Sequence, residues 1–137
     1  GVKVGLGVDG SASNDAGNLI GEARQMMLLQ RVALGADAMG AREALEGATL
    51  GGARVLGRDD CGSLEVGKRA DVAVWDISGI EAAGAWDPVA ALVFCGPQRV
   101  RHLFVEGRQV VRDGQVTTVD RGRVIEDQTR LARALMG

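Results

Sequence analysis

The chain has 137 residues, which is enough for one domain with a core of its own. Sixteen basic and eighteen acidic residues give a net charge of −2, and apolar residues make up 46% of the sequence. This balance excludes a basic nucleic-acid-binding surface, and no apolar run approaches the roughly 20 residues of a membrane-spanning helix. With no signal-peptide pattern either, we expect a cytoplasmic protein that binds neither nucleic acid nor a membrane.

The first expected element is a strand over residues 3–8 that ends at Asp9. Apolar side chains alternate with glycine and lysine in "VKVGLGV", and a small polar loop, "GSASND", follows the acid. Barrel enzymes keep their catalytic groups at the carboxyl ends of inward strands. Asp9 is therefore the candidate catalytic residue, and we expect its side chain in a pocket or an interface. The alternative is that Asp9 only stabilises a turn or caps a helix.

Two helices are expected next. An apolar stripe at helical spacing predicts the first over about 19–34, with Asn18 or Asp15 as its N-terminal cap. The second is expected over about 41–50, where the Gly51-Gly52 pair interrupts it before a last turn.

Short strands dominate the remainder of the chain. The pattern over 70–76 predicts a strand with both faces covered. Asp87 and Pro88 predict the start of a short helix within 86–96. A strand meander follows, with turns at Glu106-Gly107 and Asp113-Gly114, and the apolar stripe of the tail predicts a last helix. The expected strands of the meander are 100–105, 108–112 and 115–119.

We interpret the other candidate residues as structural rather than catalytic. Ser11 and Ser13 have no obvious base nearby, because the single histidine, His102, lies on a distant expected strand. We interpret His102 as a sheet residue, and Cys61 and Cys95 as reduced structural thiols. One histidine and no clustered cysteines cannot complete a catalytic metal site, which needs three or four ligands.

Four stretches resemble, in order, the C-terminal part of an amidohydrolase-superfamily enzyme of the cytosine deaminase and chlorohydrolase-like group. "GLGVDGSASND" resembles the last barrel strand, and "AREALEGATLGGARVLG" the helix pair after the barrel. "GSLEVGKRADVAVWD" is similar to the segment that enters the small β-sandwich, and "VRHLFVEGRQVVRDGQV" resembles the closing hairpin. "DGSASNDAGNLIGEARQMMLLQR" and "DPVAALVFCG" look most like 8-oxoguanine deaminases.

This resemblance implies an α/β fold: the C-terminal fragment of a metal-dependent (β/α)8-barrel. Residues 1–57 would be the last barrel strand and the helices after it, and residues 58–137 part of the β-sandwich with a C-terminal helix. In such enzymes the aspartate matching Asp9 binds a divalent metal, zinc or iron, and accepts a proton from the attacking water. We expect that this chain alone does not hold the metal.

The implied function is hydrolytic deamination of a purine-like base such as 8-oxoguanine. Guanine, hydroxytriazine or other triazine-like compounds, and adenosine-type substrates are the alternatives within the enzyme class. We expect the isolated chain to be inactive, and its unpaired strand edges to favour a homo-oligomer. The competing hypothesis is a stand-alone, non-catalytic β-rich module that binds a partner through an exposed edge.

Overall fold

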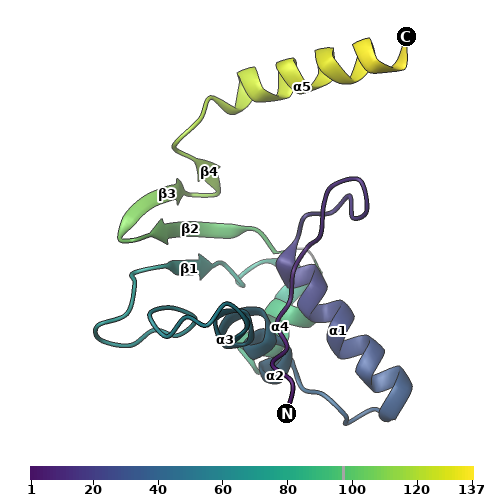
Figure 1. Ribbon diagram of the computed structural model, residues 1–137, viewed down its shortest axis with the longest axis vertical. Coiled ribbons are helices and arrows are strands. Elements are labelled where there is room, and N and C mark those ends of the chain that lie inside the picture. Colours follow the sequence, from purple (N-terminus) through teal and green to yellow (C-terminus); the bar gives the residue numbers. More distant parts are fainter. Residues whose placement is uncertain (97) are drawn as a thin grey trace.

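The computed structural model describes residues 1–96 and 98–137, and it has a group of packed helices beside a small antiparallel sheet (Figure 1). Helix α1 (Leu19–Leu34) is followed by a continuous helical stretch, α2 (Ala41–Glu46), the π-helical turn η1 (Gly47–Gly51) and α3 (Gly52–Val55). The remaining elements are β1 (Val72–Trp75), the 3-10 turn η2 (Ile80–Ala82), α4 (Pro88–Phe94), β2 (Val100–Val105), β3 (Arg108–Arg112), β4 (Gln115–Val116) and α5 (Arg121–Met136).

Helix α1 begins and ends where its sequence predicts. The Asn18 side chain caps it by accepting hydrogen bonds from the backbone N–H groups of Ile20 and Gly21. The helix ends before Gly35, whose φ of 120° is a conformation that favours glycine. The expected helix over 19–34 is confirmed.

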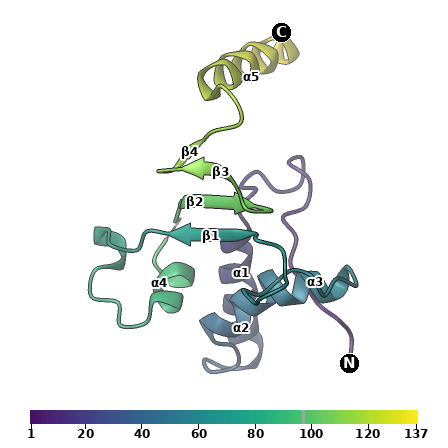
Figure 2. The same cartoon turned by 90° about the vertical axis from the view of Figure 1, so that its left-hand side faces the viewer.

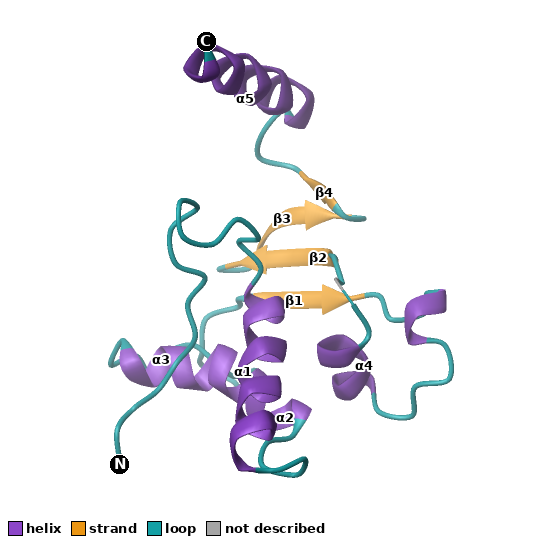
Figure 3. Cartoon of the chain, turned by 90° about the vertical axis from the view of Figure 1, so that its right-hand side faces the viewer, coloured by secondary structure: helices purple, strands orange, loops and turns teal. Residues whose placement is uncertain are grey.

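The main core lies where α1, α2 and α4 pack against one another (Figure 3). Met27 of α1 is fully buried there, and Val93 of α4 is 1% exposed. The other buried members are alanines of α1 and α2, so this core is small. Asp87 caps α4 by accepting from the Val89 N–H, and it also forms an ion pair with Arg42 of α2. The predicted start of α4 is therefore confirmed.

The expected interruption of the helix near Gly51-Gly52 exists only as the π-helical turn Gly47–Gly51 and does not break the helical course of the chain. Both glycines have helical dihedral angles, and the chain continues from α2 through η1 into α3. Their missing side chains serve a close approach instead. A Cβ on Gly51 would lie 2.7 Å from the Val4 carbonyl oxygen, and one on Gly5 would lie 2.8 Å from the Gly52 Cα. The N-terminal segment thus lies directly on the backbone of this helix.

The expected strand over 3–8 is also wrong. Residues 1–10 have no regular secondary structure, and in Figure 2 they pass α3 before turning into a loop. A strand exists only if another strand pairs with it, and within the described residues the four strands of the sheet pair only with one another. Val2 and Val4 are consequently exposed rather than buried.

The sheet has the order β1-β2-β3-β4 with every neighbour antiparallel. Glu106-Gly107 and Asp113-Gly114 have positive φ at both positions, which gives the two-residue turns that suit a hairpin. The predicted hairpin of β2 and β3 is confirmed. Strand β4 is shorter than the expected 115–119 because its pairing with β3 is limited to two residues.

The expectation that both faces of the first sheet strand are covered is wrong for this chain. Strand β1 is shorter than the expected 70–76, and its Ala73 and Val74 are exposed. The strands of the sheet contact mainly their neighbouring strands, and the helices pack mainly on one another. Among the described residues, the helices therefore do not fully cover the faces of the sheet. A run of apolar residues predicts that a strand is buried, but it does not identify the surface that covers the strand.

Helix α5 confirms the helix predicted for the tail, and it stands away from the other elements (Figures 1 and 2). None of its residues is buried, and its apolar stripe is exposed. No helix among the described residues has the length and apolar character to cross a membrane.

Candidate functional site

Asp9 lies at the turn where the N-terminal segment enters a loop over 9–17. Its φ is 60°, a conformation that non-glycine residues seldom adopt, and its Oδ1 accepts a hydrogen bond of 2.7 Å from the Gly10 N–H. This bond and the positive φ hold the carboxylate close to its own backbone. The side chain is exposed, so the described residues do not form the pocket that we expected around it. Its role as a catalytic metal ligand stays a prediction.

The loop after Asp9 is closed by hydrogen bonds within itself and to α1. The N–H groups of Ser13 and Asn14 both donate to the Gly10 carbonyl at 2.9 Å. The Asn14 side chain accepts from the Ala16 N–H at 3.1 Å and donates to Glu22 Oε1 at 2.6 Å. The sequence does not single out Asn14 and Glu22, because no local motif links residues eight positions apart. The only signal was their polarity beside the candidate acid.

The described residues supply one candidate ligand for the expected metal and do not form a complete metal site. No three histidine, cysteine, aspartate or glutamate side chains come together within the described part of the chain. The Asp9 carboxylate suits a divalent metal as a single ligand, since one oxygen is not engaged by the Gly10 N–H. Further ligands would have to come from outside these residues.

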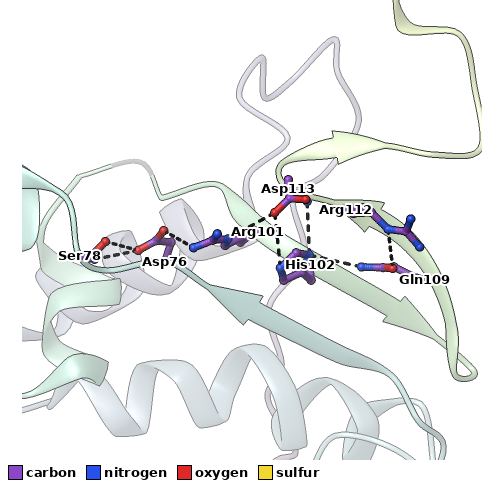
Figure 4. A network of polar contacts seen from close by, with 7 residues as sticks. All are labelled: Asp76, Ser78, Arg101, His102, Gln109, Arg112 and Asp113. Carbon is purple, nitrogen blue, oxygen red and sulfur yellow. Dashed lines mark hydrogen bonds and ion pairs between the residues drawn. The ribbon is translucent and has the colours of Figure 1, made fainter.

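His102 belongs to a polar network that crosses the sheet (Figure 4). Its Nδ1 accepts a 3.3 Å hydrogen bond from the Asp113 N–H and lies 3.3 Å from the amide nitrogen of Gln109. Arg101 lies between two carboxylates, 2.9 Å from Asp76 and 3.6 Å from Asp113. His102 is therefore a half-buried sheet residue, as predicted.

The same network extends to the end of β1. Hydrogen bonds from the Ser78 hydroxyl and N–H, with the positive charge of Arg101, lower the pKa of Asp76 below its ordinary value. The network ties this end of β1 to β2 and to the turn after β3. It does not include Asp9, so we interpret it as structural.

A second charged cluster joins the helical part to the sheet. Asp60 accepts from Arg58 at 2.8 Å and from Arg69 at 2.6 Å, and these two bonds lower its pKa well below the ordinary value. Arg69 also forms an ion pair with Glu106 of the hairpin turn. All four side chains are partly solvated, so the cluster is an anchor between two parts of the chain and not a site for chemistry.

Two open hollows lie on the described surface, and Asp9 lines neither. One, of about 340 Å³, lies between the start of α1 and the end of α4, with Asn18, Arg24 and Phe94 among its walls. The other, of about 350 Å³, is bordered by Arg99 and by residues of the network around His102.

Cys61 and Cys95 are free thiols, as predicted.

Comparison with known proteins gives consistent matches. The family model described as "Amidohydrolase family" matches residues 1–110. The chain is 44% identical over 136 residues to 8-oxoguanine deaminase from Pseudomonas aeruginosa, covering 99% of this chain and 30% of that protein. It is 45% identical over 139 residues to 5-methylthioadenosine/S-adenosylhomocysteine deaminase from Desulforudis audaxviator, covering 99% of this chain and 32% of that protein.

Solved structures give the same picture. Atrazine chlorohydrolase from Arthrobacter aurescens TC1, complexed with zinc, superposes with a TM-score of 0.88 at 38% identity, covering 95% of this chain and 30% of that one. An adenosine deaminase from Xanthomonas campestris with bound zinc superposes with a TM-score of 0.91 at 30% identity, covering 98% of this chain and 31% of that one. The chain thus spans about a third of the length of these relatives.

Proposed function

Because the chain belongs to the amidohydrolase family, we propose that it is the C-terminal part of a metal-dependent aminohydrolase that deaminates a purine-like base, with 8-oxoguanine as the first candidate. The observation that carries the proposal is the match to a deaminase of 8-oxoguanine along 99% of this chain, the Asp9 loop included. The short share of each relative that the chain spans supports the view that further catalytic residues lie in a longer protein.

We extend the proposal to the architecture. Residues 1–57 would complete a barrel, and residues 58–137 would be part of a β-sandwich. Exposed apolar side chains on the N-terminal segment and on β1 support this division, because each needs a covering surface that the described residues do not provide. The exposed apolar stripe of α5 supports assembly as a homo-oligomer.

Asp9 would perform two tasks in the reaction. Its carboxylate would hold a divalent metal, zinc as in two of the matched structures or else iron, and that ion would supply activation of the attacking water. Asp9 would accept the proton that the water loses and pass it to the departing amine, which leaves as ammonia. The Gly10 N–H at 2.7 Å would keep one carboxylate oxygen oriented through both steps.

A hybrid enzyme tests the proposal. The N-terminal part of the Pseudomonas aeruginosa 8-oxoguanine deaminase would be joined to residues 1–137 at the position that matches Gly1. We expect ammonia release from 8-oxoguanine, and a loss of about a hundredfold or more for Asp9→Asn, which keeps the shape but removes the anionic ligand and the proton acceptor. Asp59→Asn is the matched control, because Asp59 is an exposed carboxylate far from the loop in the sequence.

The same hybrid ranks the possible substrates. Comparison of kcat/KM for 8-oxoguanine, guanine, a hydroxytriazine and adenosine-type compounds identifies the preferred class. A folded, metal-loaded hybrid with no activity on any of them, or full activity in Asp9→Asn, would contradict the proposal. The first result would favour a non-catalytic interaction module, for which the exposed side chains of the edge strand β1 are the supporting observation.

A further inference from the structure

Asn14 is the point at which the Asp9 loop is attached to the helical core. Its N–H donates to the Gly10 carbonyl, its Oδ1 accepts from the Ala16 N–H, and its Nδ2 donates to Glu22 Oε1. The last of these bonds is 2.6 Å long and partly buried, and it joins the loop to the first turn of α1. The backbone and side chain of one residue therefore connect both ends of the loop to a helix.

The helix end of this connection is firmly held. Glu22 precedes Ala23, which is fully buried, and one helical turn later Met27 is fully buried as well. Asn18 caps the same turn of α1. The first turn of α1 is thus held in place by the core, and a residue that bonds to Glu22 is attached to this turn.

The loop end is held along the chain by Leu6, which packs against the core, and by the close approach of Gly5 to Gly52. The Asp9 side chain is exposed, and among the described residues it accepts one hydrogen bond, from the neighbouring Gly10 N–H. Gly10 in turn is fixed through its carbonyl, which accepts from Ser13 and Asn14. Besides the path along the chain through Leu6, a second path from Asp9 to the core therefore runs through Gly10 and Asn14 to Glu22.

We propose that Asn14 and Glu22 form a positioning pair that sets where the Asp9 carboxylate lies relative to α1. The proposal rests on the proposed function, in which Asp9 holds the metal and moves a proton. Neither residue of the pair needs to touch the substrate. Their effect on the reaction would pass through the location of Asp9, and a displacement of about 1 Å in a catalytic group costs up to roughly a hundredfold in rate.

The first test uses the 137-residue chain and needs no activity. Amide hydrogen exchange at Ser13 and Asn14 should become about tenfold faster in Glu22→Ala, since the loop loses its anchor. Glu22→Gln keeps an oxygen that accepts from Asn14 and should leave exchange within twofold of the parent. Gln25→Ala is the matched control, because Gln25 is an exposed residue of the same helix. Unchanged exchange in Glu22→Ala would overturn the proposal whatever the hybrid does.

The second test uses the hybrid enzyme and separates positioning from other roles. We expect Asn14→Ala and Glu22→Ala each to lower kcat by about tenfold to a hundredfold, with KM changed less than threefold and metal content reduced. The double variant should lose no more than either single variant, because both break one connection. Glu22→Gln should restore kcat to within threefold of the parent.

Each other outcome has a distinct meaning. A loss in Asn14→Ala without one in Glu22→Ala would mean that the bond to Glu22 is not what positions Asp9, and it would overturn the pair. Unchanged kcat and metal content in both variants, with Asp9→Asn still inactive, would overturn the positioning role while the proposed function stands. Full activity in Asp9→Asn would refute the proposed function instead, and the exchange experiment would then still decide whether the pair anchors the loop.

Discussion

Replacing Gly51 by alanine should loosen the segment that leads to Asp9, although the same change normally stabilises a helix. Gly51 is buried where the N-terminal segment lies on the helix, and an added Cβ would stand 2.7 Å from the Val4 carbonyl oxygen. Gly52 is the matched control, because a Cβ there would meet no atom within 4 Å. Both residues have helical dihedral angles, so the two substitutions differ mainly in the space available.

The magnitude follows from two opposing effects. Alanine is favoured over glycine inside a helix by about 1 kcal/mol, and both variants receive this gain. Separations under 3.0 Å are essentially never seen for a real Cβ, and the atom that Gly51→Ala would strike belongs to the backbone. Overpacking of this kind costs about 1–3 kcal/mol. Gly52→Ala should therefore be stabilised by about 1 kcal/mol, and Gly51→Ala should be less stable than Gly52→Ala by about 1–3 kcal/mol.

Urea unfolding of the 137-residue chain, followed by circular dichroism, measures the difference between the two variants. Amide exchange over residues 2–8 shows whether the segment has left the helix, which would happen if detachment costs less than strain. Faster exchange in Gly51→Ala, but not in Gly52→Ala, is the expected result. Equal stabilisation of both variants with unchanged exchange over 2–8 would refute the close approach on which this reasoning depends.

Three further predictions concern the core, the charged anchor and the last helix. Met27→Ala should lower the free energy of unfolding by about 2–4 kcal/mol because Met27 is fully buried, whereas Leu34→Ala in the same helix, 72% exposed, should change it by less than about 0.5 kcal/mol in urea unfolding. The two arginine partners of Asp60 lower its pKa, so the stability that its carboxylate contributes is present above the ordinary pKa of 3.8 and is lost as the pH falls below that value. Asp60→Asn should therefore reduce the drop in thermal midpoint between pH 6 and pH 3. An unchanged drop would contradict this prediction. Ending the chain after Asp120 should leave the thermal midpoint within about 2 °C of the parent, because α5 buries none of its residues; a larger fall would show that α5 packs on the remainder.

The features that the sequence predicted correctly depend on neighbouring residues. Each of these features depends on residues no more than three or four positions apart, so local chemistry decides it. They are the Asn18 cap, the Asp87-Pro88 start of α4 and the two hairpin turns. The prediction of a strand over 3–8 was wrong because a strand needs a neighbouring strand to pair with, and the local pattern does not contain that information. The apolar alternation before Asp9 is real, but this chain holds no strand beside it among the described residues.

The candidate site divides in the same way. Asp9 could be singled out from the order of apolar segment, acid and polar loop. Its connection to α1 could not, because the Asn14–Glu22 bond joins residues eight apart whose contact depends on how the loop folds back. The role of Gly51 was hidden for a related reason: a glycine that permits close approach looks, in sequence, like a glycine that ends a helix.

The exposed sheet faces and the free-standing α5 have a consequence for how this chain behaves in solution. A compact monomer of 14.3 kDa would have an accessible surface of about 6,800 Å² by the usual scaling with mass. This chain has 9,935 Å². If partners covered this difference of about 3,100 Å² on one chain, the interface would bury about 6,200 Å² in total, at the upper end of what obligate partners bury between them. The stability of a chain with that much uncovered area depends on what covers it, so its melting temperature should rise with its concentration or with the addition of a covering partner.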